Sequence, residues 1–84
     1  MLSIKSNKKF YTIKTMKLIL FDRLKATRIE KGLTQQQVAE ALGLNSVTYL
    51  RYEKGQRQMP LELLPMIADL FDVSLDYLFG RTDF

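Results

Sequence analysis

The side chains of this 84-residue chain that could do chemistry are its charged ones, 13 Lys and Arg against 9 Asp and Glu. The chain has no cysteine, which excludes disulfides, thiolate metal sites and cysteine nucleophiles. It has no histidine either, so the commonest general base and the commonest metal ligand are missing. We therefore expect no catalytic residue, no metal site and no cofactor, and a binding domain rather than an enzyme.

These charges are unevenly distributed. Residues 1–17 carry a net +5, residues 18–58 a net +3 and residues 59–84 a net −4. A basic N-terminal part and an acidic C-terminal part favour a protein with one face directed at a polyanion. A solvated surface whose charges are asymmetric by chance gives the same pattern. The longest apolar run, residues 18–21, is too short to span a bilayer, and the N-terminus lacks a signal-peptide core. We expect a cytoplasmic protein with no membrane partner.

The elements that must position these side chains are helices. Apolar residues at helical spacing, together with cap and stop signals, predict helices over 18–31, 35–42, 45–54, 61–71 and 75–79. Thr34 and Gln37 form a capping box, and Gly43 ends the same helix. Pro65 is awkward inside the fourth helix, because it lacks a backbone donor. No period-2 strand is visible in residues 18–84, so the fold class predicted for this part is all-α.

Residues 1–17 form a basic N-terminal arm with only a weak apolar alternation over 10–16. Three interpretations compete: a disordered arm, an added strand, or an extension upstream of a domain that begins near Met16. We favour a poorly ordered arm followed by one domain over residues 18–84.

The second and third predicted helices, joined by residues 43–45, have the pattern of a helix-turn-helix. This motif needs a small residue where the helices touch and a turn residue that tolerates positive φ. Ala39 and Gly43, four residues apart, meet both needs. Each feature alone is weak, whereas the ordered set is specific.

With these features the chain resembles the Xre/Cro-type helix-turn-helix family, the DNA-binding domain of lambdoid phage repressors. The matching segments are RIEKGLTQ (28–35), VAEALGL (38–44), YEKG (52–55) and VSLDYL (73–78). The resemblance implies a compact five-helix lambda repressor-like bundle that binds duplex DNA, usually as a dimer on a palindromic operator, with its third helix in the major groove. Tyr49, Leu50 and Pro65 depart from the usual pattern.

The outward side of the third helix holds the candidates for reading bases, because Tyr49, Tyr52 and Glu53 share its inward side. Arg51 can donate two hydrogen bonds to guanine, and Val47 suits a thymine methyl group. The candidates for base contact are Ser46, Val47, Thr48, Leu50 and Arg51. An inward-facing Thr48 is an equal alternative, and the bland interpretation of each candidate is an ordinary surface residue.

Other residues are candidates for contacts with the DNA backbone. Gln35 begins the second helix, where the resemblance supports a phosphate contact, and Gln36 is a weaker candidate. Lys54 and Arg57 follow the third helix and would meet phosphates on its flank, or be simply solvated.

Arg28 and Glu53 are interpreted as a structural ion pair. Arg28 falls on the inward stripe of the first helix and Glu53 on that of the third. Either charge buried alone would cost several kcal/mol, so the two should pair. The family has an Arg–Glu pair at the matching positions.

Two functions compete. The first is a sequence-specific, double-stranded DNA-binding transcriptional regulator, expected to be a repressor that reads the major groove with residues 45–54. The alternative is an antitoxin-like or other protein-interaction module in which DNA binding is secondary. The acidic residues 59–84 and the N-terminal arm support it. A homodimer is expected, with Leu75, Leu78, Phe79 or Phe84 as apolar contacts, although at least one of Leu75 and Leu78 is expected to pack on the first helix instead.

Overall fold

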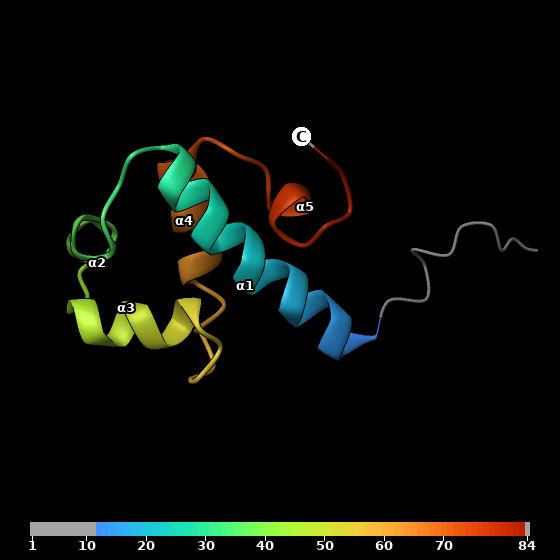
Figure 1. Cartoon of the computed structure of the whole chain (residues 1–84), viewed down its shortest axis with the longest axis horizontal. Helices are drawn as coiled ribbons and strands as arrows, with labels where there is room; N and C mark the ends of the chain where they lie inside the picture. Colours follow the sequence, from blue (N-terminus) through green and yellow to red (C-terminus); the bar gives the residue numbers. More distant parts are fainter. Residues whose placement is uncertain (1–11, 84) are drawn as a thin grey trace, which may run out of the picture.

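The computed structural model describes residues 12–83, which form five helices and no strand. The helices are α1 (Ile13–Glu30), α2 (Gln35–Leu42), α3 (Ser46–Glu53), α4 (Leu63–Phe71) and α5 (Leu75–Leu78). The predicted all-α bundle is confirmed for this part of the chain. In Figure 1, α2 and α3 lie together at one end of α1, α4 passes behind that end next to α2, and α5 lies on the opposite side of α1 from α3.

α1 begins five residues earlier than predicted. Thr12 caps it, because the Thr12 hydroxyl accepts a hydrogen bond from the Thr15 backbone N–H at 3.0 Å. Residues 13–17 are therefore helical rather than a loose arm or a strand, and the predicted start of the first helix at residue 18 is wrong. The weak alternation over residues 10–16 misled the prediction, since so short a pattern carries little information. Residues 1–11, the rest of the expected arm, lie outside the described residues.

The remaining helix ends follow their local signals. The Thr34–Gln37 capping box is present, with both hydrogen bonds made, at 2.8 and 3.0 Å. Asn45 and Ser74 cap α3 and α5 through their side chains. α5 ends at Leu78, with Phe79 as its C-cap.

α4 starts at Leu63, two residues later than predicted, and this accommodates Pro65. The backbone N–H groups of Leu63 and Leu64 donate to the carbonyls of Pro60 and Leu61, each at 3.1 Å, in a tight turn before the helix. Pro65 then lies in the first helical turn, where a backbone N–H has no partner within the helix.

The core is formed by the inward stripes of all five helices. Its members with no exposed surface are Leu24, Val38, Ala39, Tyr49, Ile67, Phe71 and Leu78. The apolar residues at helical spacing on α4 are all buried: Leu64, Ile67, Ala68 and Phe71. Tyr49, larger than the residue usual at its position, lies wholly inside this core.

Arg23, on α1, contacts α5 and the segment that follows it. Its Nη1 donates to the carbonyl oxygens of Tyr77 at 2.6 Å and Thr82 at 2.7 Å. The guanidinium also lies 4.3 Å from the centre of the Tyr77 ring, a cation–π contact. The segment after α5 therefore has a fixed path along α1.

Candidate nucleic-acid interface

α3 has one buried and one exposed side. Tyr49, Tyr52 and Glu53 are at most 5% exposed, as their shared inward side requires. Ser46, Val47 and Arg51 are exposed on the opposite side, and Val47 retains 55% of its surface. Thr48 and Leu50 are half-buried at the edges of that surface. α3 thus offers a hydroxyl, an apolar branched side chain and a guanidinium to anything that lies against it.

The turn between α2 and α3 fixes the angle at which α3 is held. Gly43 adopts φ +74°, a left-handed conformation that glycine takes without strain. The Leu44 N–H then donates to the Ala39 carbonyl at 2.8 Å, and the Asn45 side chain accepts from the Thr48 N–H at 2.8 Å. Ala39 is fully buried, so its small side chain permits the close approach of the two helices.

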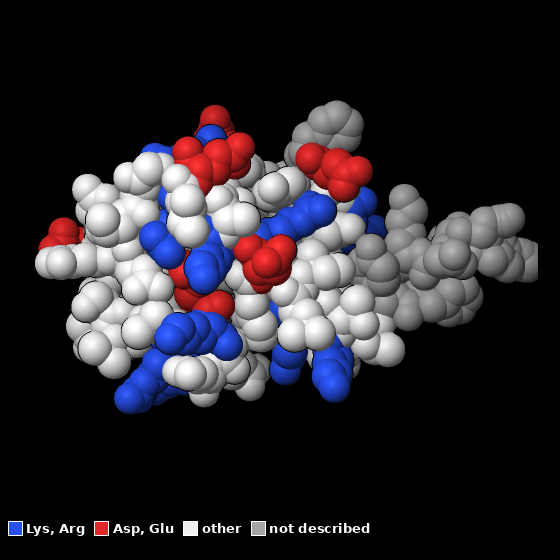
Figure 2. Space-filling model, in the orientation of Figure 1, with Lys and Arg blue, Asp and Glu red and all other residues white. Residues whose placement is uncertain are grey.

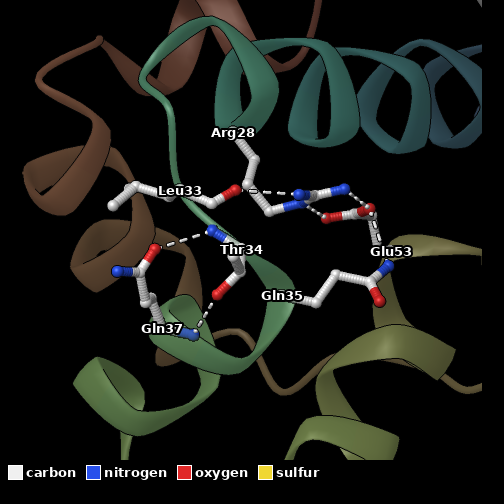
Figure 3. A network of polar contacts seen from close by, with 6 residues as sticks. All are labelled: Arg28, Leu33, Thr34, Gln35, Gln37 and Glu53. Carbon is white, nitrogen blue, oxygen red and sulfur yellow. Dashed lines mark hydrogen bonds and ion pairs between the residues drawn. The ribbon is translucent and has the colours of Figure 1, made fainter.

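A polar network centred on Glu53 ties α3 to α1 and α2 (Figure 3). The guanidinium of Arg28 takes both carboxylate oxygens, with Nε to Oε2 at 2.9 Å and Nη2 to Oε1 at 3.1 Å. Its Nη1 donates to the Leu33 carbonyl at 2.9 Å. The Glu53 side chain is only 2% exposed, so this is a desolvated, bidentate ion pair. The two charges expected to pair from the sequence are in contact.

The network also sets the protonation of its members. Burial alone raises the pKa of Glu53, but the hydrogen bonds that it accepts from Arg28 and Gln35 outweigh burial and hold it below its ordinary value. The hydrogen bond to Glu53 raises the pKa of Arg28 above its ordinary value. Burial also raises the pKa of Tyr49, and the neighbouring Glu53 carboxylate adds to this effect. Glu53 and Arg28 are therefore both charged at neutral pH.

Gln35 has a contact that the sequence did not reveal. Its amide Nε2 donates to Glu53 Oε1 at 3.3 Å, so the side chain is half-buried at the start of α2 (Figure 3). The second amide hydrogen of the Gln35 side chain has no partner inside the helix, and the same is true of the first backbone N–H groups of α2. The sequence held one signal for this contact: the Glu53 carboxylate can accept more hydrogen bonds than one Arg donates.

The other predicted backbone contacts are exposed. Gln36 lies on the outer side of α2, where its amide donates to Glu40 at 3.4 Å. Lys54 caps the C-terminal end of α3, and Arg57 follows in the loop before α4. In Figure 2, Lys and Arg side chains are the only charged groups along the lower edge of the view, beside α3 and beneath α1. Acidic side chains lie along the upper side and in the middle of the view, away from this lower edge.

Within residues 12–83, no cluster of three or more acidic side chains is arranged to hold a metal ion. None of the five helices is long and apolar enough to cross a membrane.

Comparison with known proteins decides the family of the chain. A sequence model of the helix-turn-helix family matches residues 24–78, from the middle of α1 to the end of α5. The chain belongs to this family. The match includes α2, the turn and α3, so the resemblance drawn from the four sequence motifs is confirmed.

Curated relatives of this helix-turn-helix protein are named as regulators. It is 47% identical over 60 residues to the HTH-type transcriptional regulator AnsR of Bacillus subtilis, covering 71% of this chain and 52% of the relative. It is 37% identical over 60 residues to the cryptic phage CTXphi transcriptional repressor RstR of Vibrio cholerae, covering 71% and 54%. The HTH-type transcriptional regulator ImmR of Bacillus subtilis is 34% identical over 61 residues, covering 73% and 48%. The chain spans about half the length of these relatives.

Proposed function

We propose that this protein is a sequence-specific DNA-binding regulator of transcription, acting as a repressor, that reads the major groove with α3. The observation that carries the proposal is the exposed side of α3, held rigidly from behind by the buried Arg28–Glu53 pair. An α-helix fits the width of the major groove, and a rigid mount spares the entropy of ordering it on binding. The names of the relatives, which include a phage repressor, support the same function.

The exposed side chains of α3 have the chemistry of base recognition. Arg51 can donate two parallel hydrogen bonds to O6 and N7 of guanine. Val47 and the half-buried Leu50 offer apolar contact for a thymine methyl group, and Ser46 and Thr48 can bond a base edge or a phosphate.

Contacts with the sugar-phosphate backbone would come from both flanks of α3. On one flank, the N-terminal end of α2 offers backbone N–H groups and the amides of Gln35 and Gln36. On the other, Lys54 and Arg57 are exposed cations close to the end of α3. Because Gln35 is already bonded to Glu53, it would contact a phosphate with little loss of side-chain entropy.

We propose that two copies bind a palindromic operator as a homodimer in the cytoplasm. One domain of this kind contacts one half-site, and linking two half-sites about one helical turn apart raises affinity. Leu75 on α5 is 38% exposed and offers apolar surface for a symmetric contact. Leu78 is fully buried and packs in the core, which is the alternative weighed for it from the sequence, so it adds nothing to such a surface.

Selection of bound duplexes from random DNA tests the proposal. A short consensus with two-fold symmetry is the expected result, and a consensus without symmetry would leave sequence recognition intact while contradicting the palindrome. The Arg51→Ala variant serves as the control, because its consensus should lose a single base preference. Failure of the wild-type protein to enrich any sequence would refute sequence-specific binding.

The alternative function is that of an antitoxin-like protein-interaction module in which DNA binding is secondary. One observation favours it: an open hollow of about 630 Å³ on the α4 and α5 side, whose lining includes Glu30, Asp69, Asp72 and Asp83. Failure of the random-DNA selection would direct attention to this face.

A further inference from the structure

α1 begins about three turns before the part of the chain that matches the family, and it carries a line of lysines. The family match begins at residue 24, whereas α1 begins at Ile13. Lys14, Lys17 and Lys25 are all exposed. None of them pairs with a carboxylate within the described part of the chain. We call Lys14, Lys17 and Lys25 the lysine ridge.

The ridge lies on the side of α1 that faces the end of α3. At about 100° per residue, Lys14, Lys17 and Lys25 fall within about 40° of the direction of Phe21. The Phe21 ring packs against Gly55, in the loop that follows α3, so closely that any side chain at Gly55 would overlap it. Arg28, one turn beyond Lys25, reaches Glu53 at the end of α3. These two contacts fix the orientation of the whole face.

The two acids of α1, Asp22 and Glu30, both lie off the ridge. Glu30 lies opposite Phe21, and Asp22 lies about 100° away from it, so neither acid interrupts the ridge. The first turn of α1 contains no acid at all. A lysine at the positive end of the helix dipole destabilises the helix, so intramolecular stability does not account for Lys14.

The ridge is continuous with the proposed DNA interface. Lys54 and Arg57 flank Gly55, which the Phe21 ring covers, so the cations after α3 and those of α1 border one another. The basic lower edge in Figure 2 runs from α3 to beneath α1 in the same way. Lys14 and Lys25 are eleven residues apart, roughly 16 Å along the helix, which corresponds to about five base-pair steps of duplex DNA.

From this placement we infer that the lysine ridge binds the sugar-phosphate backbone of duplex DNA outside the half-site read by α3. The inference rests on the proposed function and extends it to a flanking segment of DNA. The contacts carry no base identity, so the ridge lengthens the bound site without narrowing its sequence.

The test compares a triple variant, Lys14→Gln/Lys17→Gln/Lys25→Gln, with the wild-type protein by fluorescence anisotropy on labelled duplexes. One duplex ends at the edges of the sequence selected from random DNA, and the other continues for about ten base pairs of arbitrary sequence on each side. On the long duplex, the triple variant should bind more weakly and lose about three from the slope of log affinity against log salt. On the short duplex, most of this difference should disappear.

Arg81→Gln is the control, because Arg81 is an exposed cation beside α5 and its loss should change neither slope. Thermal unfolding should be the same for all three proteins within a few degrees, since the substituted side chains are exposed. Equal losses on both duplexes would overturn the inference in favour of long-range attraction, and an unchanged slope on the long duplex would overturn it outright. Either result leaves the proposed function standing if the wild-type protein still prefers the selected sequence over a scrambled one.

Discussion

Glu53 is the residue at which α1, α2 and α3 are joined. Its carboxylate accepts hydrogen bonds from Arg28 and Gln35, and almost none of it is exposed. A buried ion pair of this kind contributes little net stability over an apolar pair, but breaking it leaves a charge without a partner. Its consequence here is that the orientation of α3 is fixed before any ligand arrives.

Replacing Glu53 with Gln should lower the free energy of unfolding at neutral pH by about 3 kcal/mol, because Arg28 would remain buried without its counter-charge. The contribution of Glu53 is present above the ordinary carboxyl pKa of 4.5 and is lost as the pH falls through its lowered value in the folded protein. Urea denaturation at a series of pH values checks both points. A difference between wild type and Glu53→Gln that persists undiminished at strongly acidic pH would contradict the ion pair as its source.

Arg51 and Lys54 should separate base recognition from backbone attachment. Truncating Arg51 to Ala should cost ~1–3 kcal/mol on the selected sequence and relax one base preference, with much less effect on random DNA. Lys54→Gln should instead weaken binding to both duplexes alike and reduce the salt slope by about one. Binding isotherms on selected and scrambled duplexes at several salt concentrations make the comparison. Equal weakening of both duplexes by Arg51→Ala would show that Arg51 holds a phosphate.

At the scale of elements, the glycines that follow α2 and α3 differ in what surrounds them. Gly43 and Gly55 both have φ above +70°, where a side chain is strained. A Cβ at Gly43 would meet open space, whereas one at Gly55 would overlap the Phe21 ring. Gly55 therefore also determines how closely the loop after α3 approaches α1.

Gly43→Ala should destabilise the fold by about 1–2 kcal/mol, through backbone strain alone. Gly55→Ala should cost clearly more, because the Phe21 ring must also move. Thermal or chemical unfolding of both variants measures the difference. Combining Gly55→Ala with Phe21→Leu should recover part of the added cost, and strictly additive losses in that pair would mean that the ring contact is unimportant.

At the scale of the whole molecule, α5 divides its leucines between the core and the surface. Leu78 is fully buried, whereas Leu75 is 38% exposed. Arg23 fixes α5 and the residues after it against α1, so the exposed side of α5 has one orientation. A symmetric contact between two copies would need such a fixed surface.

Leu75 and Leu78 therefore make a matched pair of variants for the proposed dimer. Leu78→Ala should lower the free energy of unfolding by about 2–5 kcal/mol, as for other buried leucines. Leu75→Ala should leave the stability of the single chain nearly unchanged and shift association toward the monomer. Sedimentation velocity over a range of concentrations, together with denaturation, checks both. If wild-type protein sediments as a monomer both free and on the selected duplex, the dimer is wrong.

Much of the bundle could be read from local chemistry. The Thr34–Gln37 capping box, the Asn45 and Ser74 caps and the stop at Gly43 act within a few residues along the chain, so their effect does not depend on the rest of the fold. The inward stripes of α1 and α3 likewise predicted that Arg28 and Glu53 would meet, because opposite charges on facing buried stripes have no cheaper arrangement.

Other features depend on distances between segments far apart in the sequence, which only the tertiary structure decides. Arg23 lies 59 residues from Thr82, and Gln35 lies 18 from Glu53; no local pattern joins either pair. The same holds for the fate of Leu78 and for the lysine ridge, whose meaning depends on Phe21 facing Gly55. Periodicity determines which residues share a side of a helix, but what that side faces is set by how the helices pack, because burial and polar pairing are satisfied between elements rather than within them.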